Sequence, residues 1–451
     1  MKARRDTTLL AGFFFVSVFI QNATFTIGTV QIGFILVPVV WFAVYFFRRR
    51  IGIVPTPYFW VSFLFLGYSV FRTFTSPHLG EALIVLVYLG LDFVVMFMTY
   101  AFTMYVRHNN LERVVILSVN GLMLVSACIY LYLYFNYDAN TLAVNYEGMR
   151  QDNIRKVGSF WNVMTYATAE GDVLRFNGFY LDPNNWGLYA FTGLYFVTMM
   201  KLCEPAKPLN QRASWLTNAF GHWEYLPAVL SCLFTFSRGV MLGLVVVALS
   251  VLVGAFRSNP RLGLRLLVGT GLGFGLIVLW IVPVLYGDSV LETLIINKTT
   301  GDLDQTSVAR PFVWQTYLII FSNWPGIQLL FGLGLNRAFH EDVGFFMATH
   351  NYMMQLIAMM GLIGLALHLY MSAYLAYLIR AGRRLFTTAG FRYSIKMSFL
   401  VGVLLICFFI DTLYHFPFWM YSGMTIGLIQ YDQLQHKHRL VAAQASPIPA
   451  N

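Results

Sequence analysis

Residues 226–256 read LPAVLSCLFTFSRGVMLGLVVVALSVLVGAF, and this stretch decides the kind of fold. One continuous helix of this length would measure about 46 Å, well beyond the ~30 Å hydrocarbon layer of a membrane. Ser237, Arg238 and Gly239 interrupt the apolar run near its middle. Because an arginine at the bilayer centre costs about 2.5 to 3.5 kcal/mol, we expect the chain to reverse direction here, with Arg238 at a membrane surface.

The composition as a whole is that of an integral membrane protein. Of the 451 residues, 58% are hydrophobic and only 11% are charged, which is far from the composition of a soluble domain. Cys128, Cys203, Cys232 and Cys407 each stand alone in apolar or membrane-edge stretches. We therefore expect neither a metal site nor a disulfide framework.

Apolar runs predict an all-α polytopic membrane protein with about 12 transmembrane helices, since a helix needs roughly 20 apolar residues to cross a bilayer. The predicted spans are 9–27, 29–47, 55–71, 82–106, 113–136, 184–200, 223–236, 239–256, 264–286, 350–379, 394–413 and 417–434. The chain is expected to form a single membrane domain over residues 1–451.

The placement of Lys and Arg predicts the orientation, because positively charged loops resist translocation. With both termini in the cytoplasm, every strongly basic connection falls on the cytoplasmic side. Together these connections contain most of the 30 Lys and Arg residues. These segments are 2–5, 48–50, 107–113, 201–212, 257–265, 380–396 and 437–439. The net charge of +10 is thus expected to face anionic membrane lipid, and no nucleic-acid partner is predicted.

Two long segments, 137–183 and 287–349, then fall on the outer side, and both contain more acidic than basic residues. Loops of this length are usually functional or disordered. We expect the second to form a lid with amphipathic helices, one of them near residues 306–321. Residues 442–451, with Pro447 and Pro449, are expected to be a disordered cytoplasmic tail.

Two outward patterns contain arginine. Arg238 follows Ser237 at the predicted reversal, although a surface arginine can also simply reach lipid headgroups. Arg310 and Trp314 are four residues apart and share a helix face. A guanidinium beside an indole suits a phosphate and a sugar ring, and an interfacial helix with an aromatic anchor is the alternative.

The third pattern lies where the second outer segment enters an apolar helix. His350 is followed by Asn351 and Gln355, which share a helix face. A histidine on the outer side can act as a general base near neutral pH, or it can be a hydrogen-bonded structural residue. His340 is a rival that lacks comparable polar neighbours on a helix.

Taken in order and on a common side, these patterns resemble the O-antigen polymerase and ligase superfamily of Wzy-type polymerases and WaaL-type ligases. The resemblance spans roughly residues 175–380, and the first five spans match only as generic membrane helices. It is carried by Arg175-Phe176-Asn177-Gly178-Phe179 leading into Asp182-Pro183-Asn184, by Ser237-Arg238-Gly239, by Arg310 with Trp314, by Gly332-Leu333-Gly334, and by His350-Asn351-Tyr352.

The resemblance implies an inverting GT-C-type glycosyltransferase with its active site on the periplasmic face of a bacterial inner membrane. The implied donor is an undecaprenyl-diphosphate-linked oligosaccharide, with no cofactor and no metal. By this resemblance Arg238 and Arg310 bind the diphosphate, and His350 takes the proton of the attacking sugar hydroxyl. Arg175, Ser237, Trp314 and Asn351 are expected to bind or orient substrate. Asp411, near the outer end of its span, is a candidate for orienting His350.

The acceptor remains open between two glycans. A polymerase adds repeat units to O-antigen, capsular polysaccharide or exopolysaccharide, and the two long outer segments favour it; a chain-length regulator would then be a further partner. A ligase instead transfers the glycan to lipid A-core. A transporter of lipid-linked glycan is a third reading, supported mainly by Asp92 within an apolar span, where a helix–helix hydrogen bond is the alternative.

Overall fold

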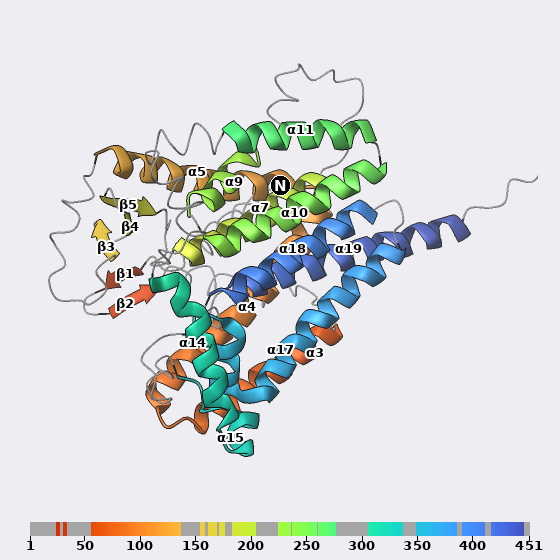
Figure 1. Ribbon diagram of the computed structural model, residues 1–451. Coiled ribbons are helices and arrows are strands. Elements are labelled where there is room, and N and C mark those ends of the chain that lie inside the picture. The colour runs from red at the N-terminus through yellow and green to blue at the C-terminus, as the bar shows by residue number, and fades with distance from the viewer. Residues whose placement is uncertain are drawn as a thin grey trace, which may run out of the picture.

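The computed structural model describes residues 24–27, 30–33, 56–136, 154–157, 161–168, 171–175, 183–203, 224–235, 237–258, 260–276, 305–336, 349–385, 390–410 and 416–445. Helices form the described core, which confirms the predicted helical membrane fold (Figure 1). Four of the described helices are long and apolar enough to cross a membrane, in α4, α5, α10 and α17. The larger predicted number of spans stays a prediction.

The helices follow the apolar runs closely. In chain order they are α3 (Pro57–Phe74), α4 (Leu79–Asn109), α5 (Glu112–Asn136), α7 (Pro183–Cys203), α9 (Leu226–Leu233), α10 (Arg238–Ser258), α11 (Pro260–Leu276), α14 (Gln305–Ser322), α15 (Gly326–Phe331), α17 (Tyr352–Leu385), α18 (Gly390–Phe408) and α19 (Pro417–Ala445). The helix expected near 306–321 is therefore present as α14. At residues 442–445 the predicted tail is helical, and the rest of that tail lies outside the described residues.

Five short strands add to the helices. Strands β1 (Thr24–Ile27) and β2 (Val30–Gly33) form an antiparallel pair, and β3 (Ile154–Val157), β4 (Trp161–Thr168) and β5 (Gly171–Arg175) form a three-stranded antiparallel sheet. The first pair replaces the predicted helix at residues 24–27 and 30–33, the adjoining ends of the predicted spans 9–27 and 29–47, whose other residues lie outside the described ones. Closely spaced Thr, Ile and Val residues around Gly28 favour a hairpin there.

The core of the bundle lies where α4, α7, α18 and α19 pack together. Tyr195 of α7 stacks against Tyr421 of α19 with ring centroids 4.6 Å apart, and its hydroxyl lies 2.6 Å from the Thr425 hydroxyl. At the crossing of α4 and α19, a side chain at Gly423 would collide with the carbonyl of Met96. Small residues of this kind let membrane helices approach closely.

The α9 helix is shorter than predicted. It has 8 residues, or about 12 Å, so the span expected at 223–236 does not form as one membrane-crossing helix. The chain leaves α9 through Phe234 and Thr235 and enters α10 at Arg238. A junction of two helices thus lies where the reversal was predicted, around Ser237-Arg238-Gly239, and the change of direction itself stays a prediction.

Helix α17 folds back on itself. Gly361 has φ +67°, outside helical geometry. Tyr352 and His368 are sixteen residues apart and would be separated by about 24 Å along a straight helix, yet their ring centroids are 4.7 Å apart. Residues 352–360, the short arm, therefore lie against residues 362–385, the long arm, as a helical hairpin. The single long helix predicted at 350–379 is corrected accordingly.

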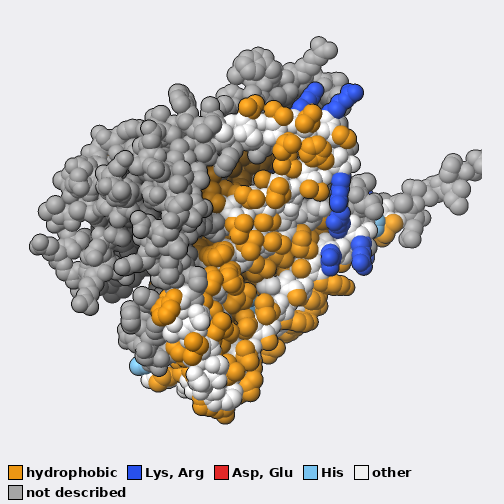
Figure 2. Space-filling model, in the orientation of Figure 1, with side chains coloured by type: hydrophobic (Ala, Val, Ile, Leu, Met, Phe, Trp, Pro, Cys, Tyr) orange, Lys and Arg blue, Asp and Glu red, His pale blue; other side chains and the backbone are white. Residues whose placement is uncertain are grey.

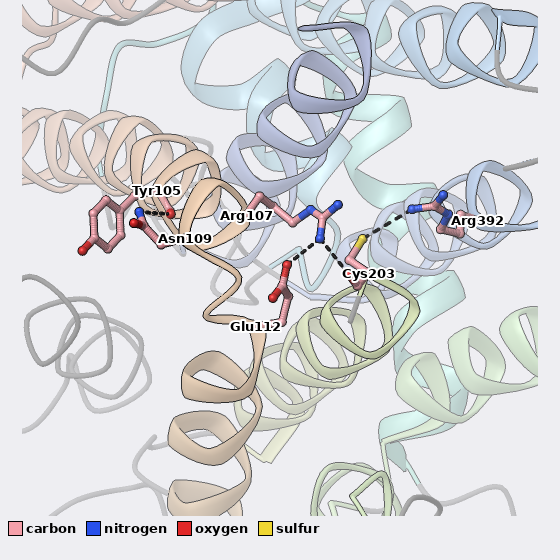
Figure 3. Close-up of polar contacts among 6 residues, drawn as sticks. All are labelled: Tyr105, Arg107, Asn109, Glu112, Cys203 and Arg392. Atoms are coloured by element: carbon pink, nitrogen blue, oxygen red, sulfur yellow. Dashed lines mark hydrogen bonds and ion pairs between the residues drawn. The ribbon is translucent and has the colours of Figure 1, made fainter. Parts of the chain in front are cut away.

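One end of the bundle gathers the basic connections. Figure 2 shows an apolar face with Lys and Arg side chains along its right-hand edge. In Figure 3, Arg107 of α4 donates to Glu112 of α5 at 2.5 Å and to the carbonyl of Cys203 at 2.7 Å, while Arg392 of α18 donates to the Cys203 sulfur at 3.8 Å. Segments predicted to be cytoplasmic thus meet at this end, called here the basic end.

The basic end is also rich in carboxylates. Glu224 forms ion pairs with Arg113 and with Lys201, the latter at 2.6 Å. Lys396 of α18 lies 3.9 Å from Asp432 of α19. The guanidinium of Arg107 additionally lies 4.6 Å from the centre of the Tyr431 ring. These contacts tie five helices together, α4, α5, α7, α18 and α19.

Candidate functional site

Trp314 connects two of the patterns recognised in the sequence. It lies on α14, half-buried, and its indole N–H donates a 2.9 Å hydrogen bond to the carbonyl of Thr349. Thr349 directly precedes His350. This hydrogen bond from a side chain to the backbone fixes the segment before α17 relative to α14. The helix that contains Arg310 and the segment that contains His350 are therefore neighbours.

Phe408 and Phe409, at the end of α18, connect Trp314 with the remaining pattern, Ser237-Arg238-Gly239. The Trp314 ring lies 5.3 Å from the Phe408 ring and 6.1 Å from the Phe409 ring, centre to centre. On its other side Phe409 lies against Gly239, where an added Cβ would be 3.4 Å from the ring. The start of α10 and α14 thus contact this aromatic pair directly, and the start of α17 is joined to them through Trp314.

The α9–α10 junction is held by short local contacts. Thr235 is buried; its hydroxyl donates to the carbonyl of Cys232 at 2.7 Å and accepts from the Ser237 N–H at 3.3 Å. The Ser237 carbonyl accepts from the Met241 N–H at 2.9 Å, which starts α10. The beginning of α7 packs closely here, because a side chain at Gly187 would meet Val240 and Thr235.

His350 is exposed and has a left-handed backbone conformation, with φ +45°. Its neighbours on both sides are buried, with Thr349 fully covered and Asn351 1% exposed. Asn351 caps the short arm, since its side-chain oxygen accepts from the N–H groups of Met353 at 2.9 Å and Met354 at 3.1 Å. Non-glycine residues with positive φ are uncommon and cluster at functional sites.

The substrate-binding or orienting part expected of Asn351 stays a prediction, and the structure adds a second part. The side chain caps the helix and is buried beside His350, so its amide oxygen already serves the backbone of the short arm. Gln355 is buried as well, 1% exposed. The polar face predicted from Asn351 and Gln355 is therefore turned into the protein, and it supports the position of His350.

The other predicted site residues are placed by their backbones. Arg238 is the first residue of α10, Arg310 lies in α14 one turn before Trp314, and Arg175 ends strand β5. Their side chains lie outside the described residues. Ser237 is described and is 3% exposed, so its side chain is covered. Asp411 and the rival His340 lie outside the described residues altogether.

Helix α14 has apolar side chains both buried and exposed. On its described part, Val313, Tyr317 and Phe321 are buried, while Phe312, Leu318 and Ile319 are more than half exposed. The expected lid over the outer face stays a prediction.

Sequence reasoning gave no role to Thr349, Phe408 or Phe409. Thr349 acts through its carbonyl, which every residue has, so no side-chain pattern could reveal it. The two phenylalanines were part of an apolar run that predicted only a membrane span, at 394–413. Their contacts with Trp314 and Gly239 at the end of α18 are a tertiary property.

A family model matches part of this chain. Residues 225–369 match the family model described as O-antigen ligase, which supports the resemblance to the O-antigen polymerase and ligase superfamily. The matched segment covers less than half of the 451 residues. It begins just before α9 and ends in the long arm of α17, and it includes Arg238, Arg310 and His350. No protein of curated function matches the chain.

Proposed function

We propose that this protein is an inverting membrane glycosyltransferase that polymerises lipid-linked oligosaccharide repeat units. The family match supports an enzyme of the O-antigen ligase and polymerase type in general. The observation that carries the finer proposal is that Trp314 links three segments: its ring contacts Phe408 and Phe409, which pack on Gly239, and its N–H donates to Thr349. These segments contain Arg238, Arg310 and His350, the residues that such a reaction would use.

The donor in this proposal is a glycan linked to undecaprenyl diphosphate. Arg238 and Arg310 bind the two phosphates, because a guanidinium presents paired donors that match phosphate oxygens. Their positive charges stabilise the diphosphate as it leaves, which is the part a metal ion has in other glycosyltransferases. Arg238 also stands at the first residue of α10, where the helix dipole favours an anion.

His350 is the proposed general base. Its side chain is exposed while the chain on either side is buried and hydrogen-bonded, so the imidazole is presented from a fixed backbone. It accepts the proton of the acceptor hydroxyl as that oxygen attacks the anomeric carbon of the donor sugar. The bond from this carbon to the diphosphate oxygen breaks in the same displacement, which inverts the configuration. Asp411, in this proposal, orients the imidazole.

Four further residues have supporting parts. Trp314 offers its ring beside the site and fixes Thr349 through its N–H. Asn351 caps the short arm under His350, and Ser237 begins α10 next to Arg238. Arg175 ends β5, a short distance in sequence before α7 packs on the α9–α10 junction, and we assign it to glycan contact.

The proposed orientation places the basic end in the cytoplasm and the site near the periplasmic surface of a bacterial inner membrane. The apolar helices and the family match support a membrane protein. The positive charge at one end supports this direction because cytoplasmic loops contain the excess of Lys and Arg. Residues 137–183 and 287–349 would then be periplasmic, both termini would be cytoplasmic, and the whole chain would act as one membrane domain.

An O-antigen ligase is the second candidate. The description of the matching family favours it, and the same three residues would serve, with lipid A-core as acceptor in place of a second glycan. A glycan transporter is less well supported. Asp92, its main evidence, is fully buried on α4, and neither of its carboxylate oxygens has a hydrogen-bond partner among the described residues.

The test is reconstitution of the full chain in lipid vesicles with an undecaprenyl-diphosphate-linked repeat unit, first alone and then with lipopolysaccharide core. A ladder of glycans from the donor alone is the result expected of a polymerase. A single shift of the core lipid, seen only when the core is present, would replace the polymerase by the ligase. Absence of any product in both reactions would contradict a transferase.

A further inference from the structure

Arg72 is a buried arginine that no part of the proposed reaction uses. It lies in the last turn of α3 and is 6% exposed. Buried charges normally meet an opposite charge, but no carboxylate lies within ion-pair distance of Arg72 in the part of the chain that the structure describes. Its guanidinium instead donates to the carbonyl of Gly332 at 2.9 Å and to the Thr75 hydroxyl at 2.6 Å.

Gly332 begins the loop 332–335, which follows α15 and closes the turn of the α17 hairpin. The short arm ends at Gly361, so its last carbonyls lose their partners within the helix. Leu333 N–H donates to the carbonyl of Ala358 at 2.8 Å, and Gly334 N–H donates to that of Met359 at 3.0 Å. The Tyr68 hydroxyl of α3 donates to the carbonyl of Met360 at 2.8 Å. All three carbonyls before the turn are thus satisfied from outside α17.

The loop has a backbone conformation that requires glycine at two positions. Gly332 and Gly334 have φ +75° and φ +108°, and a side chain on Gly332 would meet the backbone of Met360 and Gly361. The other anchors of the loop also come from the end of α3, since the Ser76 hydroxyl donates to the carbonyl of Leu335 at 3.1 Å. Figure 1 shows α15 and the turn of α17 beside this end of α3.

We propose that Arg72 is a positioning residue for the reaction, which acts through the loop 332–335 and the α17 turn to hold the short arm and, at its base, His350. This inference rests on the proposed function. The path runs from Arg72 to Gly332, from Leu333 and Gly334 to the end of the short arm, and along its 9 residues, 352–360, to Asn351 and His350. Arg72 contacts none of the reacting atoms in this proposal.

A buried arginine is suited to this task. Its planar guanidinium can bond the Gly332 carbonyl and the α3 end at once, and a flexible lysine cannot reproduce both directions. Loss of Arg72 leaves the Gly332 carbonyl without this donor, so the loop loosens and the short arm shifts. A displacement of about 1 Å far from the chemistry can cost on the order of 100-fold in rate.

The test compares Arg72→Ala, Arg72→Lys and Tyr68→Phe with Arg384→Ala, an exposed arginine at the opposite end of α17. The full chain in lipid vesicles is assayed for kcat, for KM of the lipid-linked donor, and for hydrogen exchange at the Leu333 and Gly334 amides. For Arg72→Ala we expect kcat to fall on the order of 100-fold, KM to change little, and both amides to exchange faster. Arg72→Lys should recover part of kcat, and Arg384→Ala should match the wild type.

Four results would overturn the proposal. Wild-type kcat in Arg72→Ala would remove the positioning role, and a rise in KM equal to the fall in kcat would assign Arg72 to donor binding instead. A loss explained by less folded protein, with kcat per folded molecule unchanged, would reduce it to a structural residue. If Arg72→Ala does not fold, Tyr68→Phe must show a smaller fall in kcat, again with little change in KM. If the wild type transfers no glycan, the proposed function fails. Unchanged amide exchange in the variants would separately overturn the role of Arg72 in holding the loop 332–335.

Discussion

The two ends of the helix bundle treat positive charge in opposite ways. At the basic end, Arg107 meets Glu112, Lys201 meets Glu224 and Lys396 meets Asp432. At the other end, Arg72 is bonded to the neutral oxygens of Thr75 and Gly332, and Trp314 donates to a backbone carbonyl. In the proposed function, Arg238 and Arg310 at this end bind an anion that the substrate brings. The comparison therefore separates residues for folding from residues for chemistry.

The largest difference in turnover between the two ends is expected when a histidine at each end is replaced. His350→Ala should lower kcat by about 100- to 10,000-fold, the range of a positioned general base, without a comparable loss of donor affinity or folded protein. The measurement is the transfer rate of the reconstituted enzyme at saturating donor. His436→Ala, an exposed histidine near the basic end, is the control and should keep wild-type turnover. Wild-type rates in His350→Ala would remove the base assignment.

The basic end should respond in stability instead. Glu112→Gln leaves the Arg107 guanidinium, 12% exposed, without its carboxylate, and breaking such a buried pair costs about 3 kcal/mol. We expect a lower Tm in detergent and unchanged turnover per folded molecule. Glu81→Gln, an exposed carboxylate in the first turn of α4, should change neither. A slower reaction at unchanged Tm would contradict the division between the two ends.

Arg238 and Arg310 should affect binding as well as turnover. Replacing either by Ala is expected to remove about 1.5 to 3 kcal/mol of charge-assisted hydrogen bonding, seen as weaker binding of the diphosphate-linked donor in a titration. Lys should restore part of the affinity, because the charge returns without the planar fork. Arg383→Ala, exposed at the other end of α17, is the matched control. Equal donor affinity in all of these variants would sink the diphosphate site.

The smallest effect should come from Trp314. Trp314→Phe keeps an aromatic ring against Phe408 and Phe409 but removes the donor to the Thr349 carbonyl. One such hydrogen bond contributes about 1 kcal/mol, so we expect turnover to fall by a factor of about five. Trp60→Phe, 68% exposed on α3, should leave turnover as it was. A larger loss for Trp60 than for Trp314 would speak against the proposed contact.

Much of the fold could be predicted from local pattern. The apolar runs gave α3, α4, α5, α7 and α10 to within a few residues, since each helix buries its length in protein or lipid and needs no distant information. The hairpin in α17 could not be found in this way. Gly361 is one of several glycines in an apolar run, and only the loop 332–335, which supplies the donors to Ala358 and Met359, makes a reversal there possible.

The candidate site divides along the same line. His350, Asn351 and Trp314 could be singled out because their side chains are unusual for an apolar chain. Arg72 could not, although it is equally unusual, because it stands in the last turn of a helix where a basic residue is common. The hydrogen bond from Arg72 to Gly332 joins residues 260 positions apart, and no spacing rule reaches that far.

That separation also has a consequence for biogenesis. Ribosomes add about 5 to 20 residues per second, so α3 would enter the membrane roughly 10 to 50 s before Gly332 is made. During this interval Arg72 must keep its guanidinium in water or among lipid headgroups at the end of α3. The arginine would be drawn inward only when the loop arrives, which makes the closing of the α17 hairpin a late event in the assembly of the protein in the membrane.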